Sequence, residues 1–298
     1  MEILPQILVI SIIASAIYAL IAAGLTLTFG TLEFINFAHG EIAMAGAFVF
    51  LYFFSDFGLG IFPALIVTTL IIAALGMFIE RTTFRPVRDK QEFIPLVLSI
   101  GISILISAAV MLKFGGGSHT YAVANEMPTV YRIWNEAVII SQTQIVIILS
   151  SVVLISALFA FLKYSKTGKA IRAVSDNKQV AAILGINVNR TIVILFTIAS
   201  GLAAIAGILI AFDQNLNPRM GLQLSIKAFA AIILGGVGKL HGAILGAIII
   251  GFSENMIVGL TNIPSSYKST IVFTIFIIVL IFKPYGIFGG NKEEVESR

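Results

Sequence analysis

Long apolar runs separated by short polar stretches follow one another along the whole chain. Apolar runs of about 18 or more residues are typical of membrane spans. Helices are expected because backbone amides in hydrocarbon must be satisfied within their own segment. The predicted fold is therefore all-α: a polytopic helical membrane protein with about eight or nine membrane segments. We expect spans near residues 7–29, 34–54, 62–79, 94–113, 143–162, 191–212, 226–238, 241–259 and 269–282.

Two of these segments are too short to cross a membrane as regular helices. The run 226–238 gives about 20 Å of helix, against roughly 30 Å of hydrocarbon. The run 43–54 is also too short, unless the polar stretch before it lies inside the membrane. Both adjoin a polar, glycine-containing break, near 36–41 and 235–242. Interrupted segments of this kind indicate discontinuous helices along a transport path.

The distribution of lysine and arginine predicts the orientation of the spans. Cytoplasmic loops carry an excess of these residues. The rule places the N-terminus and a loop at about 114–142 outside, and the C-terminus and a loop at about 163–190 in the cytoplasm. The basic stretches are Arg81, Arg85, Arg88 and Lys90, the segment 163–190, and Lys283, Lys292 and Arg298.

Composition agrees with a membrane protein. Of 298 residues, 58% are hydrophobic and 11% are charged, whereas a soluble domain carries about a quarter charged residues. We expect one transmembrane domain over 1–298, because no soluble domain fits between the runs. The net charge of +4 lies in loops and predicts no nucleic-acid partner. Without cysteines there is no disulfide or thiolate metal site, and we expect no cofactor and no metal.

Polar residues are concentrated in the stretch "TLEFINFAHGE", 31–41. One interpretation is that Asn36, His39 and Glu41 line the pathway or cap a broken helix, because Asn and a carboxylate can satisfy free amides at a helix start. The other is a short cytoplasmic turn with solvated side chains. The residues leave both open. Glu254 lies well inside a predicted span, where it serves either the pathway or a hydrogen bond that fixes helix packing.

The segment 163–190 predicts an amphipathic pair of surface helices. Ile171, Val174, Ala181 and Leu184 share one side, and Lys169, Arg172, Asp176 and Gln179 the other. Asn177 and Lys178 interrupt the pattern, and Gly185 is suited to a helix C-terminus. Such a pair can dock into a cytoplasmic partner or rest on the lipid surface.

Enzyme chemistry is not indicated. "GGVGKLHG" lacks the glycine spacing of a phosphate-binding loop, and Leu240 stands where Ser or Thr would bind magnesium. No Ser/His/Asp constellation or paired-carboxylate site is evident.

Several blocks match a known family in order, from about Tyr18 to Gly289. They are "YALIAAGLTLTFGTLEFINFAHGEIAMAGAFV", "IERTTFRPVR", "YSKTGKAIRAVSDNKQVAAILGINVNRTIVILFTIASGLAAIAGIL", "NPRMGLQLSIKAFAAIILGGVGKLHGAILGAIIIG" and "KPYGIFG". The chain resembles the permease subunits of branched-chain amino acid ABC importers, of the LivH type.

The resemblance implies a multi-pass protein of the prokaryotic plasma (inner) membrane. Its partners would be a second homologous permease (LivM type), two cytoplasmic ATPases and an extracytoplasmic solute-binding protein. It implies a functional break at Asn36–Glu41 and an ATPase-coupling role for the loop. The coupling residues would be Gly168, Lys169, Arg172, Ala173, Asp176, Ala181, Gly185 and Ile186. The chain departs from the family pattern at Lys239-Leu240-His241, where members of the family commonly have smaller or neutral residues after the glycine-rich turn.

Two questions stay open at this point. In the outer loop, Trp134, Tyr121 and Tyr131 form a face for the binding protein or anchor the chain at the membrane interface. The cargo of similar permeases includes urea, short amides and other amino acids. An ion-driven secondary transporter is the alternative class, although it would carry ionisable residues along several spans.

Overall fold

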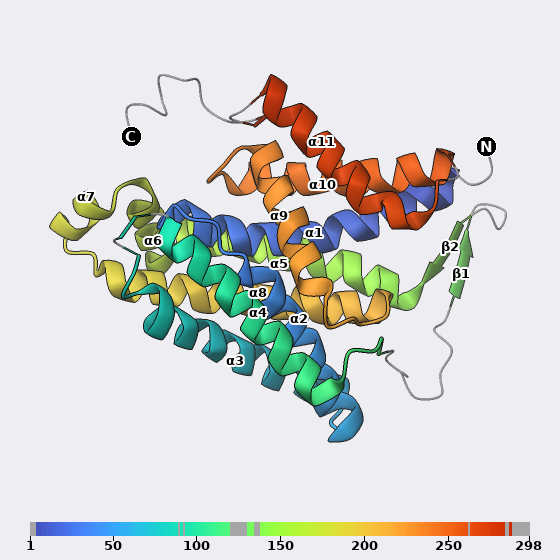
Figure 1. The fold of residues 1–298 in the computed structure, drawn as a ribbon, viewed down its shortest axis with the longest axis horizontal. Helices are drawn as coiled ribbons and strands as arrows, with labels where there is room; N and C mark the ends of the chain where they lie inside the picture. Colours follow the sequence, from blue (N-terminus) through green and yellow to red (C-terminus); the bar gives the residue numbers. More distant parts are fainter. Residues whose placement is uncertain are drawn as a thin grey trace.

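The computed structural model describes residues 4–88, 90–91, 93–119, 130–133, 138–261, 263–283 and 286–287. Helices account for nearly all of it (Figure 1). In chain order they are α1 (Leu4–Leu32), α2 (Ala38–Leu51), α3 (Ile61–Ile79), α4 (Phe93–Phe114), α5 (Gln142–Tyr164), α6 (Lys166–Asp176), α7 (Lys178–Ile183), α8 (Val188–Asp213), α9 (Met220–Gly235), α10 (Leu240–Thr261) and α11 (Lys268–Phe282).

Wider and tighter turns extend three of these helices. π-helical turns prolong α2 over Tyr52–Asp56 and α3 over Glu80–Phe84, and a 3₁₀ turn, Ser265–Tyr267, precedes α11. With these extensions, eight helices in the described part of the chain are long and apolar enough to cross a membrane. A ninth apolar helix, α9, is shorter: it has 16 residues, or about 24 Å. The expected eight or nine segments are confirmed.

One pair of strands interrupts the helical fold. β1 (Val130–Ile133) and β2 (Val138–Ser141) run antiparallel, with Val130 opposite Ser141. The Gln6 side chain donates to the carbonyl of Ile139 at 3.1 Å and accepts from its amide at 2.8 Å, so the hairpin is held against the start of α1. The sequence patterns did not predict this hairpin. Trp134 and Tyr121 lie outside the described residues.

The apolar interior forms two cores. One gathers side chains of α2, α3 and α8, and the other those of α1, α9 and α10, with α8 contributing to both. Nearly every residue of α2 is buried. Outside the bundle, α3, α4, α5 and α11 expose large apolar side chains, a surface that a soluble monomer rarely shows and that suits lipid. Examples are Phe62, Leu70, Leu105, Leu112, Val153 and Ile281.

Small residues let the inner helices approach closely. A Cβ on Gly46 of α2 would lie 2.7 Å from Cα of Ala204 in α8, and one on Gly207 of α8 would overlap the backbone of Ala43. α9 and α10 meet in the same way at Gly235 and Gly242. Close backbone approach is how helices associate where lipid removes the hydrophobic drive. These glycines therefore serve helix packing.

The loops lie at two ends of the bundle. The turn between α3 and α4 lies at the same end as α6 and α7, whereas the β1–β2 hairpin and the start of α1 lie at the opposite end (Figure 1). Two of the basic stretches, Arg81–Lys90 and 163–190, therefore share one end, as the positive-inside argument requires. Lys292 and Arg298 lie outside the described residues.

Several predicted boundaries were wrong. The expected span 34–54 is a helix that begins only at Ala38, because the preceding backbone is not helical. The expected span 226–238 covers 220–235: the less apolar stretch "MGLQLS" belongs to α9, and Gly236, with φ of 106°, ends it. A window that scores only apolar residues misses such a polar helix start.

Candidate functional site

The site is built around the interruption between α1 and α2. α1 ends where Glu33 takes a left-handed φ of 63°, a conformation that terminates helices. The Asn36 side chain then accepts from the amide of Ala38 at 3.1 Å, which starts α2. Asn36, His39 and Glu41 are each at most 3% exposed. The interpretation of these three side chains as solvated is therefore wrong, and the Asn36 side chain accepts from the first amide of α2.

Two serines from distant helices satisfy the non-helical backbone of the break. Ser99 of α4 accepts from the amide of Phe37 at 3.2 Å. Ser225 of α9 donates to the carbonyl of Phe37 at 2.7 Å and accepts from the amide of Gly40 at 2.9 Å. Irregular backbone at membrane depth is tolerated only where protein supplies such partners. The break is thus held by α4 and α9 together.

The side chains of the break point to different helices. His39 faces α1, where a Cβ on Gly24 would lie 2.8 Å from its Nε2. Glu41 faces α4 and α9: its Oε1 is 3.5 Å from the hydroxyl of Ser103, and a Cβ on Gly221 would overlap its Oε2. Among the described residues, neither His39 Nε2 nor Glu41 Oε2 has a hydrogen-bond partner. The break therefore keeps unused polar atoms inside the bundle.

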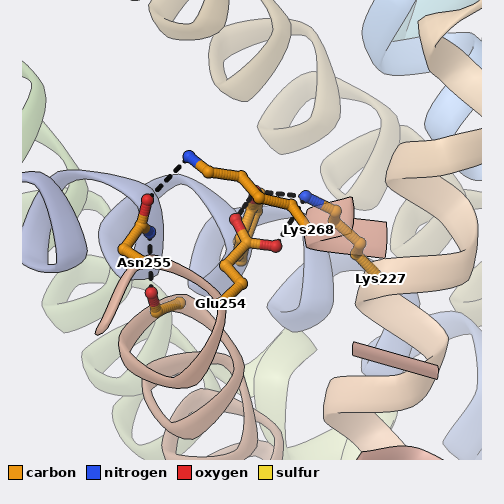
Figure 2. A network of polar contacts seen from close by, with 6 residues as sticks. Lys227, Glu254, Asn255 and Lys268 are labelled. Atoms are coloured by element: carbon orange, nitrogen blue, oxygen red, sulfur yellow. Dashed lines mark hydrogen bonds and ion pairs between the residues drawn. The ribbon is translucent and has the colours of Figure 1, made fainter. Parts of the chain in front are cut away.

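A second polar cluster joins α1, α9 and α10 (Figure 2). Lys227 of α9 donates to Glu254 Oε2 at 2.8 Å and to the hydroxyl of Tyr18 at 2.7 Å. Tyr18 donates to Glu254 Oε1 at 2.6 Å. Beside it, Lys268 of α11 contacts the Asn255 side chain at 2.7 Å. We expected Glu254 to serve either the pathway or a hydrogen bond that fixes helix packing. In the structure it accepts hydrogen bonds from Tyr18 and Lys227 and forms an ion pair with Lys227, and these contacts connect three helices.

The loop between α5 and α8 folds as the predicted helix pair. Ser165 accepts from the amide of Gly168 at 2.8 Å and starts α6, and Asn177 accepts from Val180 at 2.9 Å and starts α7. Gly185, with φ of 82°, ends the pair, and the amide of Ile186 returns to the carbonyl of Ala181 at 3.0 Å. The predicted interruption at Asn177 and Lys178 and the predicted helix end at Gly185 are confirmed.

The predicted coupling residues divide between the surface and the interior of this pair. Gly168 and Ala181 are buried, as are Ile171 and Val174. Leu184 is 72% exposed, so its predicted place on the buried side is wrong: α7 ends at Ile183, and the helical period does not reach Leu184. The coupling residues with exposed side chains or backbone are Lys169, Arg172, Asp176 and Gly185, and the partly buried ones are Ala173 and Ile186.

The helix pair touches the end of α1 directly. The hydroxyls of Thr31 and Ser175 are 2.9 Å apart. Lys178, the first residue of α7, lies 3.4 Å from Glu33, the left-handed residue that ends α1. Two contacts therefore connect the loop to the chain just before the break at Asn36–Glu41.

Sequence reasoning missed several residues of the site. Ser99 and Ser103 recur at every fourth position of α4, a spacing that places them on one helix face and that could have marked it. Lys227 could have been recognised as the opposite charge to Glu254 in a neighbouring apolar segment. Tyr18 and Ser225 gave no comparable signal, since single hydroxyls are common in membrane helices.

Comparisons with known proteins bear on this arrangement. The family described as "Branched-chain amino acid transport system / permease component" matches residues 7–280. The chain belongs to this family. It is 35% identical over 305 residues to the high-affinity branched-chain amino acid transport system permease protein BraD of Pseudomonas aeruginosa, covering 98% of this chain and 97% of BraD. It is 36% identical over 290 residues to the corresponding permease LivH of Escherichia coli K12, covering 94% and 93%.

A solved structure shares the fold. A chain of PsaBC from Streptococcus pneumoniae, solved in complex with Fab, superposes with a TM-score of 0.52, over 97% of this chain and 94% of that chain. Sequence identity is 14%, so the likeness concerns the fold alone. Together with the family, the eight apolar helices identify a multi-pass membrane permease. Both relatives named above are described as transport system permease proteins.

Proposed function

We propose that the chain is the membrane-spanning permease subunit of an ATP-binding-cassette importer for branched-chain amino acids. The observation that carries the proposal is the match to BraD and LivH along almost the entire length of both partners. The break, the serines that hold it and the helix pair all lie within the matched residues. The permease forms a path and hydrolyses no ATP itself, so energy must enter from partners.

The proposed assembly follows from that need. Two cytoplasmic ATPases drive the cycle, a second homologous permease completes the path, and an extracytoplasmic binding protein delivers the amino acid. In this arrangement the end that carries α6 and α7 faces the cytoplasm, and the end that carries the β1–β2 hairpin faces outward (Figure 1). The protein then lies in the prokaryotic inner membrane with its N-terminus outside.

The helix pair offers a surface that suits an ATPase. Ile183 and Leu184 are 83% and 72% exposed at the end of α7, and α6 of the same pair exposes the charges of Arg172 and Asp176. Exposed apolar side chains on a helix pair that also exposes charges are the composition of a protein contact. Gly168 allows α6 to lie directly on the end of α5, because a Cβ there would overlap the carbonyl of Phe161.

The helix pair α6–α7 is connected to the break between α1 and α2 by direct contacts, through which its movement can be transmitted. The Thr31–Ser175 and Glu33–Lys178 contacts join α6 and α7 to the last turn of α1. Glu33 adopts a conformation that few non-glycine residues occupy, and such positions absorb changes of backbone angle at switch regions. Movement of the pair therefore tilts α1 relative to α2 and separates α2 from α4 and α9, which opens Asn36, His39 and Glu41 to the path.

Uptake by the reconstituted complex tests this function. The chain is co-expressed with its partner subunits, placed in proteoliposomes and supplied with binding protein. Labelled leucine is expected to accumulate only with ATP, and labelled urea to stay outside. Leucine uptake by this subunit alone, or uptake driven by an ion gradient without ATP, would show a secondary transporter instead. ATP-driven uptake of urea and not of leucine would keep the transporter class and change the cargo.

A further inference from the structure

Glu41 differs from the other buried carboxylates of the bundle. Glu254 lies 2.8 Å from Lys227, and Glu80 lies 3.4 Å from Arg88. Within the described part of the chain, Glu41 has no salt bridge, and its carboxylate interacts with the hydroxyl of Ser103 and the backbone of Leu222. A buried carboxylate without a cation is costly, because desolvation is not repaid by an opposite charge. The cost indicates a group kept for a ligand.

Two helix starts surround the carboxylate and explain how it is tolerated. Glu41 lies in the first turn of α2. It also reaches the first turn of α9, because Gly221 has no side chain in the way. The free amides and the dipole at a helix N-terminus stabilise a negative charge by about 0.3–1 kcal/mol each. These partial charges lower the cost of the anion, but they leave Oε2 without a partner.

The unpaired oxygen, Glu41 Oε2, restricts the kind of ligand that can bind. An ionised carboxylate only accepts hydrogen bonds, whereas an ammonium group carries three donors and a full positive charge. Ser103 adds a hydroxyl that can accept a second of those donors. At the same break the rings of Phe37 and Phe229 lie 6.3 Å apart between centroids and offer apolar surface to an aliphatic side chain. A neutral solute such as urea has no charge with which to pair Glu41.

We propose that Glu41 binds the α-ammonium group of the transported amino acid while it passes the break. This proposal rests on the proposed function, and it assigns the substrate-contacting group that selects amino acids over uncharged cargo. In the structure the carboxylate is closed off between α4 and α9, so the ammonium meets it when those helices separate from α2. Lys227 pairs with Glu254 and Arg88 with Glu80, which leaves Glu41 as the buried carboxylate without a salt bridge among the described residues.

Carboxyl labelling measures this contact directly. The complete transporter in proteoliposomes is treated with dicyclohexylcarbodiimide, and modification of Glu41 is followed by mass spectrometry, with Glu254 as the reference. Three probes separate the groups: leucine, 3-methylbutylamine, which lacks the carboxylate, and 4-methylpentanoate, which lacks the ammonium. Leucine and the amine should each slow labelling of Glu41 about tenfold at ten times their dissociation constants. The acid should have no effect. Protection by the acid, or by none of the three, would overturn the assignment.

A substitution gives the second readout. Glu41→Gln keeps the shape and removes the charge, so leucine uptake should fall roughly tenfold to a hundredfold, as loss of one charged hydrogen bond predicts. Subunit assembly and ATP hydrolysis should persist. Asp56→Asn, which removes an exposed charge at the far end of the same helix, should leave uptake unchanged. If the wild type imports leucine but Glu41→Gln imports it equally well, the ammonium site is refuted and the importer assignment stands.

Discussion

Replacing Lys227 by methionine tests whether the ion cluster of α1, α9 and α10 holds the bundle together. Methionine keeps most of the apolar stem and removes the ammonium group. Two hydrogen bonds are lost, at 2.8 Å to Glu254 and at 2.7 Å to Tyr18. Hydrogen bonds to charged groups contribute about 1.5–3 kcal/mol each, which gives about 3–6 kcal/mol. Breaking a buried ion pair by removing one partner costs about 3–5 kcal/mol.

The expected loss is therefore about 3–5 kcal/mol in the free energy of unfolding. Tyr18 keeps its bond to Glu254 at 2.6 Å, which holds the loss within that range. Unfolding of the purified protein by sodium dodecyl sulfate in mixed micelles gives the number. Lys268→Met is the comparison variant, because it removes a lysine of the same region whose hydrogen bond goes to the neutral Asn255 and whose nearest acidic group is Asp213, outside the Glu254 cluster. It should lose less than half as much.

A double substitution completes the test. Glu254→Leu in the Lys227→Met background removes the stranded carboxylate, so the two changes together should cost less than the sum of the two single changes. Two results would refute the claim that the ion pair holds α1, α9 and α10 together. One is that the losses of unfolding free energy from the two single changes simply add, and the other is that Lys227→Met loses no more than Lys268→Met.

Three further changes probe the loop and the break. Gly168→Ala places a Cβ against the carbonyl of Phe161 and should push α6 off α5, so that uptake falls while ATP hydrolysis continues; unchanged uptake would show that this contact is dispensable. Charge reversal at both Arg172 and Asp176 should likewise uncouple hydrolysis from uptake with membrane levels unaltered, as measured by immunoblot; normal uptake would exclude coupling. Ser225→Ala leaves two backbone groups of the break unsatisfied and should cost about 1–3 kcal/mol in the same unfolding assay, whereas a loss near zero would contradict its role in holding the break.

The sequence predicted the elements whose signal is local. Hydropathy located the spans, because lipid contact and helix length act on consecutive residues. Gly185 was recognised as a helix end and Asn177 as an interruption of the helical pattern, because both signals depend on the residue itself and its nearest neighbours. The burial of Asn36 and Glu41 was only one of two interpretations, since the sequence of a polar stretch near a helix end does not show whether its side chains contact water or other helices.

Contacts between distant segments could not be read in the same way. The break is held by Ser99 and Ser225, which lie 62 and 188 positions from Phe37. Nothing in the stretch 31–41 indicates those partners. The environment of Glu254 likewise depends on Lys227 and Tyr18 from two other helices. The error at Leu184 has another cause: the helical period was extended past Ile183, where α7 ends.

Coupling to ATPases requires that α6 and α7 lie on the cytoplasmic side of the membrane, where the ATPases can reach them. The chain has no cysteine, so a single Leu184→Cys substitution reports this position without background, and Phe57→Cys reports the other end of the bundle, where Phe57 is exposed. A membrane-impermeant maleimide should label Leu184→Cys in inside-out vesicles and not in intact spheroplasts, and Phe57→Cys the reverse. Labelling of Leu184→Cys from outside the cell would contradict the coupling of this permease to cytoplasmic ATPases.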